Sequence, residues 1–256
     1  MNLFITRAFT GFFLLTPVLA QQTPTVRRDA QALTILVKAL AVATTQNAVS
    51  LPQDSVAQGT ITFVNGTRAT LRIEHKGSRD LRQDIVFPDH QVSYVTTGGQ
   101  GYSVREGKKA SLPLWVTQFH YPEHIPAISQ MADFLLPNMN LTYMGEEKVN
   151  GLVAYHIMFT LVPTDGTPSE VAALISEFHV FVDGQTFLVT KTQSYIFSPD
   201  AIENRSLAEM YYSDYRSVNG LLVPFHVSRY ISGEKYCDIT FSSVAVNVGL
   251  TDSDFQ

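Results

Sequence analysis

The sequence predicts an α+β protein, mainly antiparallel β, in which one sheet of roughly eight to eleven strands curls around a helix near the N-terminus. Three observations predict this class. Asn-Gly pairs recur between β-prone segments, those segments alternate apolar and polar residues, and only a few short segments have the apolar spacing of helices. The 236 residues after the first 20 suffice for one large core, so we expect a single domain over residues 21–256.

Asn-Gly pairs predict tight hairpin turns, because both residues accept the positive φ angles of a type I′ turn. The three pairs are Asn65-Gly66, Asn150-Gly151 and Asn219-Gly220. Three further pairs predict turns of the same kind: Asp183-Gly184, Ser232-Gly233 and Glu106-Gly107. Closely spaced turns of this kind predict a meander of sequential antiparallel strands.

Alternate residues between the turns form apolar rows, which should face the helix-covered side of the sheet. The residues of these rows are Ala69, Leu71, Ile73, Val153, Tyr155, Ile157, Phe159, Leu161, Leu221, Val223, Phe225 and Val227. The intervening Arg68, Arg72 and Glu74 should face water. Cys237 shares the parity of Ile239, which indicates a buried, inert thiol, and a lone cysteine excludes an intramolecular disulfide.

Three segments have helical signals. Thr23-Pro24 reads as an N-cap followed by a first-turn proline, and the apolar residues from Val26 to Leu40 follow helical spacing, so we expect a helix over residues 24–45. Apolar spacing predicts a second helix over residues 125–135, ending before Pro137. A capping box at residues 167–170 predicts a short helix over residues 171–175, inside an insertion that spans residues 163–176.

Residues 1–20 have the pattern of a secretory signal peptide. Arg7 precedes an apolar segment too short to span a bilayer, and Ala20 ends a small-residue cleavage motif. We therefore expect a periplasmic or secreted protein without a transmembrane segment after cleavage. Cleavage removes Arg7 and leaves 17 basic against 23 acidic residues, a balance that gives no reason to bind nucleic acid.

Motifs that carry catalytic chemistry are absent from the sequence. It has no nucleophile elbow, no phosphate-binding glycine loop and no paired cysteine ligands, so we expect no enzyme and no cofactor. The segment from His120 to His124 matches a zinc-peptidase pattern, which requires both histidines on one helix face. Pro122 lies between them and fits a first helical turn, so we interpret the segment as a helix start and expect no metal site. The acidic C-terminal residues Asp252 and Asp254 look solvated.

The arrangement of these segments resembles the periplasmic lipoprotein-carrier superfamily, the LolA-like and RseB-like proteins. A signal peptide precedes a helix, a long meander and a second helix, and the sharpest part of the resemblance is the hairpin pattern from Tyr211 to Asn247. The resemblance implies an incompletely closed, strongly curved β-barrel that covers an N-terminal helix and a second helix. It also implies an apolar concave face that accepts a lipid or a lipoprotein acyl chain. No residue here matches the carrier's functional arginine.

Two functions follow from these expectations, and a hydrolase with an unrecognised site is a third alternative. The first is a non-catalytic carrier or sensor that binds an apolar ligand in the concave cleft, with the insertion at residues 163–176 at its mouth. The expected ligand-binding residues are Leu71, Ile73, Tyr155, Ile157, Phe159, Phe225 and Val227. The second is an interaction module that meets a membrane-associated protein partner through an exposed sheet edge.

Overall fold

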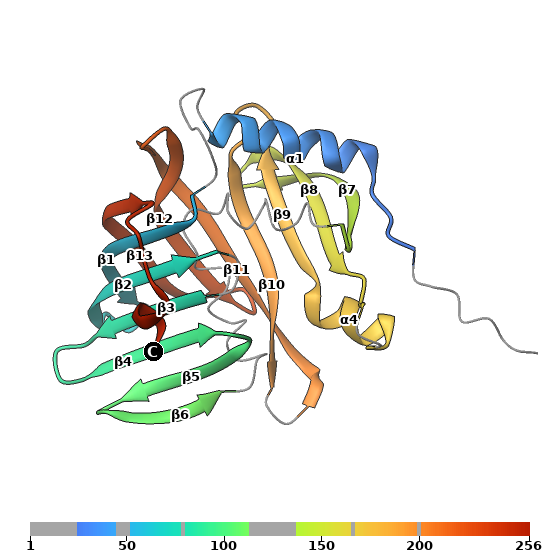
Figure 1. Cartoon of the computed structure of the whole chain (residues 1–256). Coiled ribbons are helices and arrows are strands. Elements are labelled where there is room, and N and C mark those ends of the chain that lie inside the picture. The colour runs from blue at the N-terminus through green and yellow to red at the C-terminus, as the bar shows by residue number, and fades with distance from the viewer. Residues whose placement is uncertain (1–24, 45–51, 78–79, 113–136, 165–166, 199–200) are drawn as a thin grey trace, which may run out of the picture.

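The computed structural model describes residues 25–44, 52–77, 80–112, 137–164, 167–198 and 201–256 (Figure 1). The predicted signal peptide at residues 1–20, the predicted helix at residues 125–135 and the His120–His124 segment lie outside these residues. None of the helices in the described ranges has the length and apolar character of a membrane span.

The described residues form one antiparallel sheet of 13 strands that curves without closing (Figure 1). Its strands are β1 (Asp54–Phe63), β2 (Arg68–Lys76), β3 (Asp80–Val86), β4 (Gln91–Thr97), β5 (Gln100–Arg105), β6 (Lys108–Leu112), β7 (Met139–Val149), β8 (Leu152–Leu161), β9 (Phe178–Asp183), β10 (Val189–Ser198), β11 (Ala201–Val218), β12 (Leu221–Ile231) and β13 (Glu234–Val246). Their order in the sheet is β6-β5-β4-β3-β2-β1-β13-β12-β11-β10-β9-β8-β7. The predicted open, curved architecture is therefore confirmed, whereas the predicted eight to eleven strands are too few.

Two meanders, β1–β6 and β7–β13, meet where β1 pairs with β13. Every other strand pair in the sheet joins neighbours in the chain. The register of β1 against β13 shifts between Gln58 and Gly59. At Gly59 a Cβ atom would lie 2.2 Å from the carbonyl oxygen of Thr240, so this close approach of two backbones requires glycine.

Four of the six predicted turns have the expected backbone. Positive φ angles occur at both residues of Asn150-Gly151, Asn219-Gly220, Ser232-Gly233 and Glu106-Gly107, each between two paired strands. The other two are wrong in type. The Asn65 amide oxygen accepts the N–H of Thr67 in a longer loop, and the Asp183 carboxylate accepts the N–H groups of Gln185 and Thr186 in the turn between β9 and β10.

The N-terminal helix α1 spans Ala30–Ala43, six residues shorter at its start than the helix that the sequence predicts. Residues before Ala30 pair with β7 instead: the N–H of Leu141 donates to the carbonyl of Arg27, and the N–H of Asp29 donates to the carbonyl of Leu141. The Asp29 carboxylate then accepts the N–H groups of Gln31 and Ala32, which makes Asp29 the N-cap in place of Thr23.

The buried face of α1 is rotated from the apolar row Ala30, Leu33, Val37 and Leu40 that predicts the helix, although Leu33 and Leu40 remain partly buried. Its buried residues are Ala32, Ile35, Leu36, Ala39 and Ala43, whereas the side chain of Val37 is 52% exposed. Two apolar stripes share the same helical spacing in this segment, so spacing alone leaves the rotation of the helix open. The pairing of residues 27–29 with β7 fixes where the helix begins.

The short helix in the insertion is present. Helix α4 spans Ser169–Ser176 and contacts β8. Its N-cap is Pro168, which provides no side-chain cap, so the predicted capping box at Thr167 is wrong. Ser176 ends the helix, and its Oγ accepts the N–H of Leu161 at 2.7 Å, which ties the helix to the end of β8.

The C-terminal segment, residues 247–256, packs on the face of the first meander opposite to the apolar rows, here called the outer face. The buried Asp54 carboxylate accepts the N–H groups of Val248, Gly249 and Leu250. The short 3₁₀ helix Asp252–Phe255 follows, and the fully buried ring of Phe255 packs against Val95 and Tyr102. This segment therefore packs against the sheet as part of the folded protein. Asp252 is exposed as predicted, but the tail as a whole is not solvated.

Candidate functional site

The face of the sheet that contacts α1, here called the inner face, carries the predicted ligand-binding residues. Six of the seven are buried, with relative exposures of 0–6%, and Tyr155 is partly buried. They belong to one hydrophobic cluster that also contains Ala32, Ile35, Leu36 and Ala39 of α1. The buried residues of the seven are Leu71, Ile73, Ile157, Phe159, Phe225 and Val227. The predicted parity of the rows is thus confirmed, while their ligand-binding role stays a prediction.

One apolar cluster spans both arms of the curved sheet. Leu71 lies on β2 and Ile157 on β8, and six strands lie between β2 and β8 in the sheet order. In a flat sheet, strands spaced about 4.8 Å apart would keep such residues about 34 Å apart. Figure 1 shows the sheet curving between these two arms, and the cluster that contains both residues also contains the buried side of α1.

Helix α1 crosses the second meander and is joined to it at both ends. Arg28 bridges to Leu141 on β7 just before the helix begins, and Thr44 bridges to Leu221 on β12 just after it ends. Its 14 residues give a length of about 21 Å. The six strands from β12 to β7 would span about 24 Å if they were flat. The helix therefore spans the curved meander from β7 to β12. Backbone bridges attach it at its two ends, and apolar side chains attach it along its length.

A ring contact lies where α1 passes over the turn between β9 and β10. The Lys38 ammonium lies 5.1 Å from the centre of the Phe187 ring, and Phe187 lies 5.9 Å from the ring of the partly buried Tyr155. Phe187 has a φ angle of 58°, which is uncommon for an aromatic residue. This group joins the exposed side of α1 to the rim of the apolar cluster.

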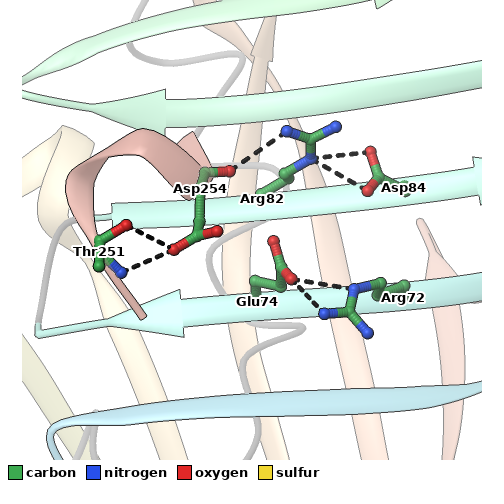
Figure 2. Close-up of polar contacts among 6 residues, drawn as sticks. All are labelled: Arg72, Glu74, Arg82, Asp84, Thr251 and Asp254. Atoms are coloured by element: carbon green, nitrogen blue, oxygen red, sulfur yellow. Dashed lines mark hydrogen bonds and ion pairs between the residues drawn. The ribbon is translucent and has the colours of Figure 1, made fainter. Parts of the chain in front are cut away.

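One predicted water-facing residue is buried. Arg68 is exposed, and Arg72 is partly exposed, but Glu74 is only 7% exposed. Figure 2 shows the reason: the C-terminal segment covers this part of the outer face, and Glu74 pairs with Arg72 at 2.5 Å beneath it. On β3 the Arg82 guanidinium binds Asp84 and also donates to the carbonyl of Asp254. The prediction for Glu74 is wrong because nothing in β2 itself indicates a covering segment that is distant in sequence.

Arg229 is a buried inner-face residue that the sequence reasoning missed. Its relative exposure is 2%, and its guanidinium carbon lies 5.5 Å from the centre of the Tyr236 ring. It continues the odd-numbered row that ends at Val227 in the prediction, so the parity of the strand could have found it. Opposite it in the register lies Cys237, which is fully buried, as the sequence predicts.

Two surface pockets lie over the outer face of β1–β5, with volumes of about 480 and 420 Å³. Their lining mixes polar and charged side chains, including Gln58, Arg72, Asp84, Arg82 and Gln91, with apolar residues such as Val86, Val95 and Val104. Within the described part of the chain, no group of three or more His, Cys, Asp or Glu side chains is arranged to hold a metal ion.

Comparison with known proteins places this geometry among solved folds. No family model and no curated protein sequence matches the chain. An outer membrane lipoprotein-sorting protein domain from Vibrio parahaemolyticus is similar with 11% identity and a TM-score of 0.54, over 88% of this chain and 96% of that one. A LolA superfamily protein from Nitrosomonas europaea is similar with 13% identity and a TM-score of 0.54, over 88% of this chain and 97% of that one.

The chain has the LolA-like fold. A DUF1329 family protein from Desulfovibrio piger shares it, with 14% identity, a TM-score of 0.55 and coverage of 88% of this chain and 96% of that one. The resemblance that the sequence predicts is thus confirmed as a fold. In this LolA-like sheet, the inner face under α1 is where the predicted ligand-binding residues gather.

Proposed function

We propose that the protein is a non-catalytic carrier or sensor that binds an apolar ligand, such as a lipid or a lipoprotein acyl chain, between α1 and the inner face. The observation that carries the proposal is the continuous apolar cluster under a helix that backbone bridges hold at its two ends. Three of the five buried side chains of α1 are alanines, which present a smooth, narrow surface to the sheet. Each methylene of a ligand buried there contributes about 0.8 kcal/mol.

The ligand reaches the inner face by parting side chains of the cluster, because six of the seven expected contacts are nearly inaccessible in this structure. Tyr155 at the rim is the exception, and its neighbour Phe187, in the turn between β9 and β10, packs at the edge of the cluster next to Lys38. The insertion with α4 lies at the end of β8. We propose these two features as the mouth of the site.

The same proposal covers location and partners. The signal-peptide pattern supports export to the periplasm or beyond, after cleavage following Ala20. A protein of the same fold is described as a lipoprotein-sorting domain, which supports a lipoprotein or lipid as the ligand class. The protein acts without a cofactor and without nucleic acid in this proposal.

A binding assay with delipidated protein and a fluorescent fatty acid tests the proposal. Tyr155→Gln should weaken binding by about tenfold, because it removes a half-buried aromatic surface from the mouth. Val153→Gln is the matched control: Val153 lies on the same strand and in the same row, but it is 46% exposed and should not affect binding. Phe159→Gln, at the fully buried centre, should abolish binding wherever circular dichroism shows that the fold persists.

Absence of binding by the delipidated protein, or equal affinities for Tyr155→Gln and Val153→Gln, would overturn the carrier proposal. The alternative is then an interaction module for a membrane-associated protein. The observation that favours it is β6, the terminal strand of the sheet, four of whose five residues are exposed. Protection of the amides of residues 108–112 from hydrogen exchange in the presence of a partner would support strand addition at this edge.

A further inference from the structure

The outer face of the second meander carries a row of polar side chains whose members come from β7, β8, β9, the residue just before β9, and β11. Glu147 on β7 contacts His156 on β8, with 2.6 Å between Oε1 and Nδ1. His156 Nε2 lies 2.8 Å from Nδ1 of His179 on β9. His179 Nε2 lies 3.0 Å from Oε1 of Glu177, whose other oxygen accepts a hydrogen bond from Arg205 on β11 at 2.8 Å.

The three contacts of the His156 and His179 rings require a fixed number of N–H protons. An ionised carboxylate only accepts hydrogen bonds, so Glu147 and Glu177 each require an N–H from the ring that faces them. The contact between His156 and His179 requires one more N–H. The three contacts therefore need three protons on four ring nitrogens, whereas two neutral imidazoles carry only two.

We propose that His156 and His179 form a proton-binding site that holds one shared proton above the neutral count at pH 7. With that proton, all three contacts are hydrogen bonds. The charges of Glu147, Glu177, Arg205 and the histidine pair then sum to zero. Without it, an oxygen of the half-exposed Glu147 or of the more buried Glu177 faces the lone pair of a ring nitrogen, and each histidine itself is less than 10% exposed.

The surroundings disfavour the extra charge on His156. Burial lowers the pKa of His156, and the nearby positive charges of His179 and Lys191 lower it further, against the opposing effect of Glu147. In the proposed three-proton arrangement His156 is thus the neutral ring, protonated at Nδ1 toward Glu147. The pKa of Glu177 lies below its usual range, because hydrogen bonds from Arg205 and His179 outweigh the effect of its burial.

The remaining charged groups near the pair are already matched. Lys191 on β10 pairs with Glu209 on β11 at 2.5 Å, and its ammonium lies 4.9 Å from the Phe181 ring. That ring in turn stacks on His156, with 4.2 Å between the ring centres. Among the described residues, Glu147, Glu177, Arg205, Lys191 and Glu209 are charged groups on this face, together with Asp183 on β9, whose carboxylate accepts the N–H groups of Gln185 and Thr186. None of them supplies the missing N–H between the two rings.

Nitrogen NMR of the histidine rings tests the proposal directly on the full exported chain. Protein labelled with ¹⁵N at histidine should show at pH 7 one neutral ring protonated at Nδ1 and one doubly protonated ring among the slowly exchanging resonances. Two neutral rings, or two doubly protonated rings, would overturn the shared-proton site.

A pair of variants separates this site from a merely structural role. Glu177→Gln keeps the shape, and its amide can donate to His179 Nε2. The extra proton is then no longer needed, and the doubly protonated ring should be absent at pH 7. Glu146→Gln changes an exposed neighbour of Glu147 and should leave the ring resonances unchanged. An unchanged doubly protonated ring in folded Glu177→Gln would contradict the proposal. The wild-type proton count remains decisive if that variant does not fold.

Discussion

The outer face carries two polar clusters that are organised in different ways. Under the C-terminal segment, charged residues pair with partners two positions away on the same strand, as Arg72 does with Glu74 and Arg82 with Asp84. Over the second meander, by contrast, the chain from Glu147 to Arg205 crosses from β7 to β11. The first cluster forms wherever its strand forms, whereas the second depends on the register of several strands at once.

This difference separates two sources of stability. Same-strand pairs add little to the tertiary structure, because both partners are close in the unfolded chain as well. What holds the C-terminal segment is the burial of Phe255, together with the N–H groups that Asp54 accepts. In the second cluster the polar contacts themselves join the strands. The following predictions test this division.

Removing the Phe255 ring should have the largest effect. Phe255→Ala should lower the free energy of unfolding by about 3 kcal/mol, because a fully buried aromatic ring leaves its contacts with Val95 and Tyr102. Urea unfolding measures this loss. A loss below about 1 kcal/mol would show that the C-terminal segment contributes little to the folded sheet.

Low pH should lower the stability of the protein through His75, which follows Glu74 on β2. Burial lowers the pKa of His75 to about 4, despite the opposing charges of Asp80 and Asp54. Between about pH 6.5 and pH 4 the unfolded chain therefore binds a proton that the folded chain does not, and stability falls as the pH falls. The expected loss reaches about 3 kcal/mol at pH 4.

Urea unfolding of His75→Gln as a function of pH checks this source of acid sensitivity. The variant should lose less stability than the wild type between pH 6.5 and pH 4, whatever its stability at pH 7. His226→Gln, at a partly exposed position, is the control and should retain the wild-type slope. Identical slopes for all three proteins would rule out His75 as the source.

Breaking the second cluster should have an intermediate effect. Glu177→Ala should cost about 2 kcal/mol, because it leaves Arg205 and His179 without their shared carboxylate in a site where each is mostly buried. Glu146→Ala, at an exposed position on β7, should change stability by less than about 0.5 kcal/mol. Equal effects of the two substitutions would mean that the cross-strand chain adds no stability.

The smallest effect is expected for Lys76, whose ammonium binds the exposed Asp252 at 2.6 Å. Lys76→Met should leave the unfolding midpoint within experimental scatter, because solvent screens this pair. Near-ultraviolet circular dichroism should show that Tyr102 keeps its environment, since Phe255 remains in place. A change in that signal would show that the ion pair, rather than the ring, positions the C-terminal segment.

Much of the fold could be predicted because its signals are local. The turns at residues 150–151 and 219–220 follow from residue types that accept positive φ angles, and the rows through Ile157 and Val223 follow from period-two alternation. The hairpins from β3 to β6 lacked Asn-Gly turns apart from a weaker Glu-Gly signal, so the strand count was too low. The helix start was misplaced because Asp29 and Thr23 are both good caps, and only the pairing with β7 decides between them.

The site was predictable in part for the same reason. Parity alone identifies which side chains point toward α1, and six of the seven predicted residues are buried there. The histidine chain was not predictable, because it depends on the register of β7 to β9. The bulge between Tyr143 and Gly145 shifts that register so that Glu147 comes within reach of His156. The burial of Glu74 likewise depends on a segment almost 180 residues away in the chain.

The junction between β1 and β13 has a consequence for how the chain folds. Apart from the insertion between β8 and β9, each meander is built from hairpins with short connections, so each arm can assemble from local contacts. The pairing of Ser55 with Val246, by contrast, closes a loop of about 190 residues, which costs about 5 kcal/mol of chain entropy. During synthesis, the edge of β1 that pairs with β13 therefore stays unpaired until β13 has been synthesised. Joining of the two arms is expected to be the slow step of folding, and until then the free edge of β1 is the part of the sheet most open to aggregation.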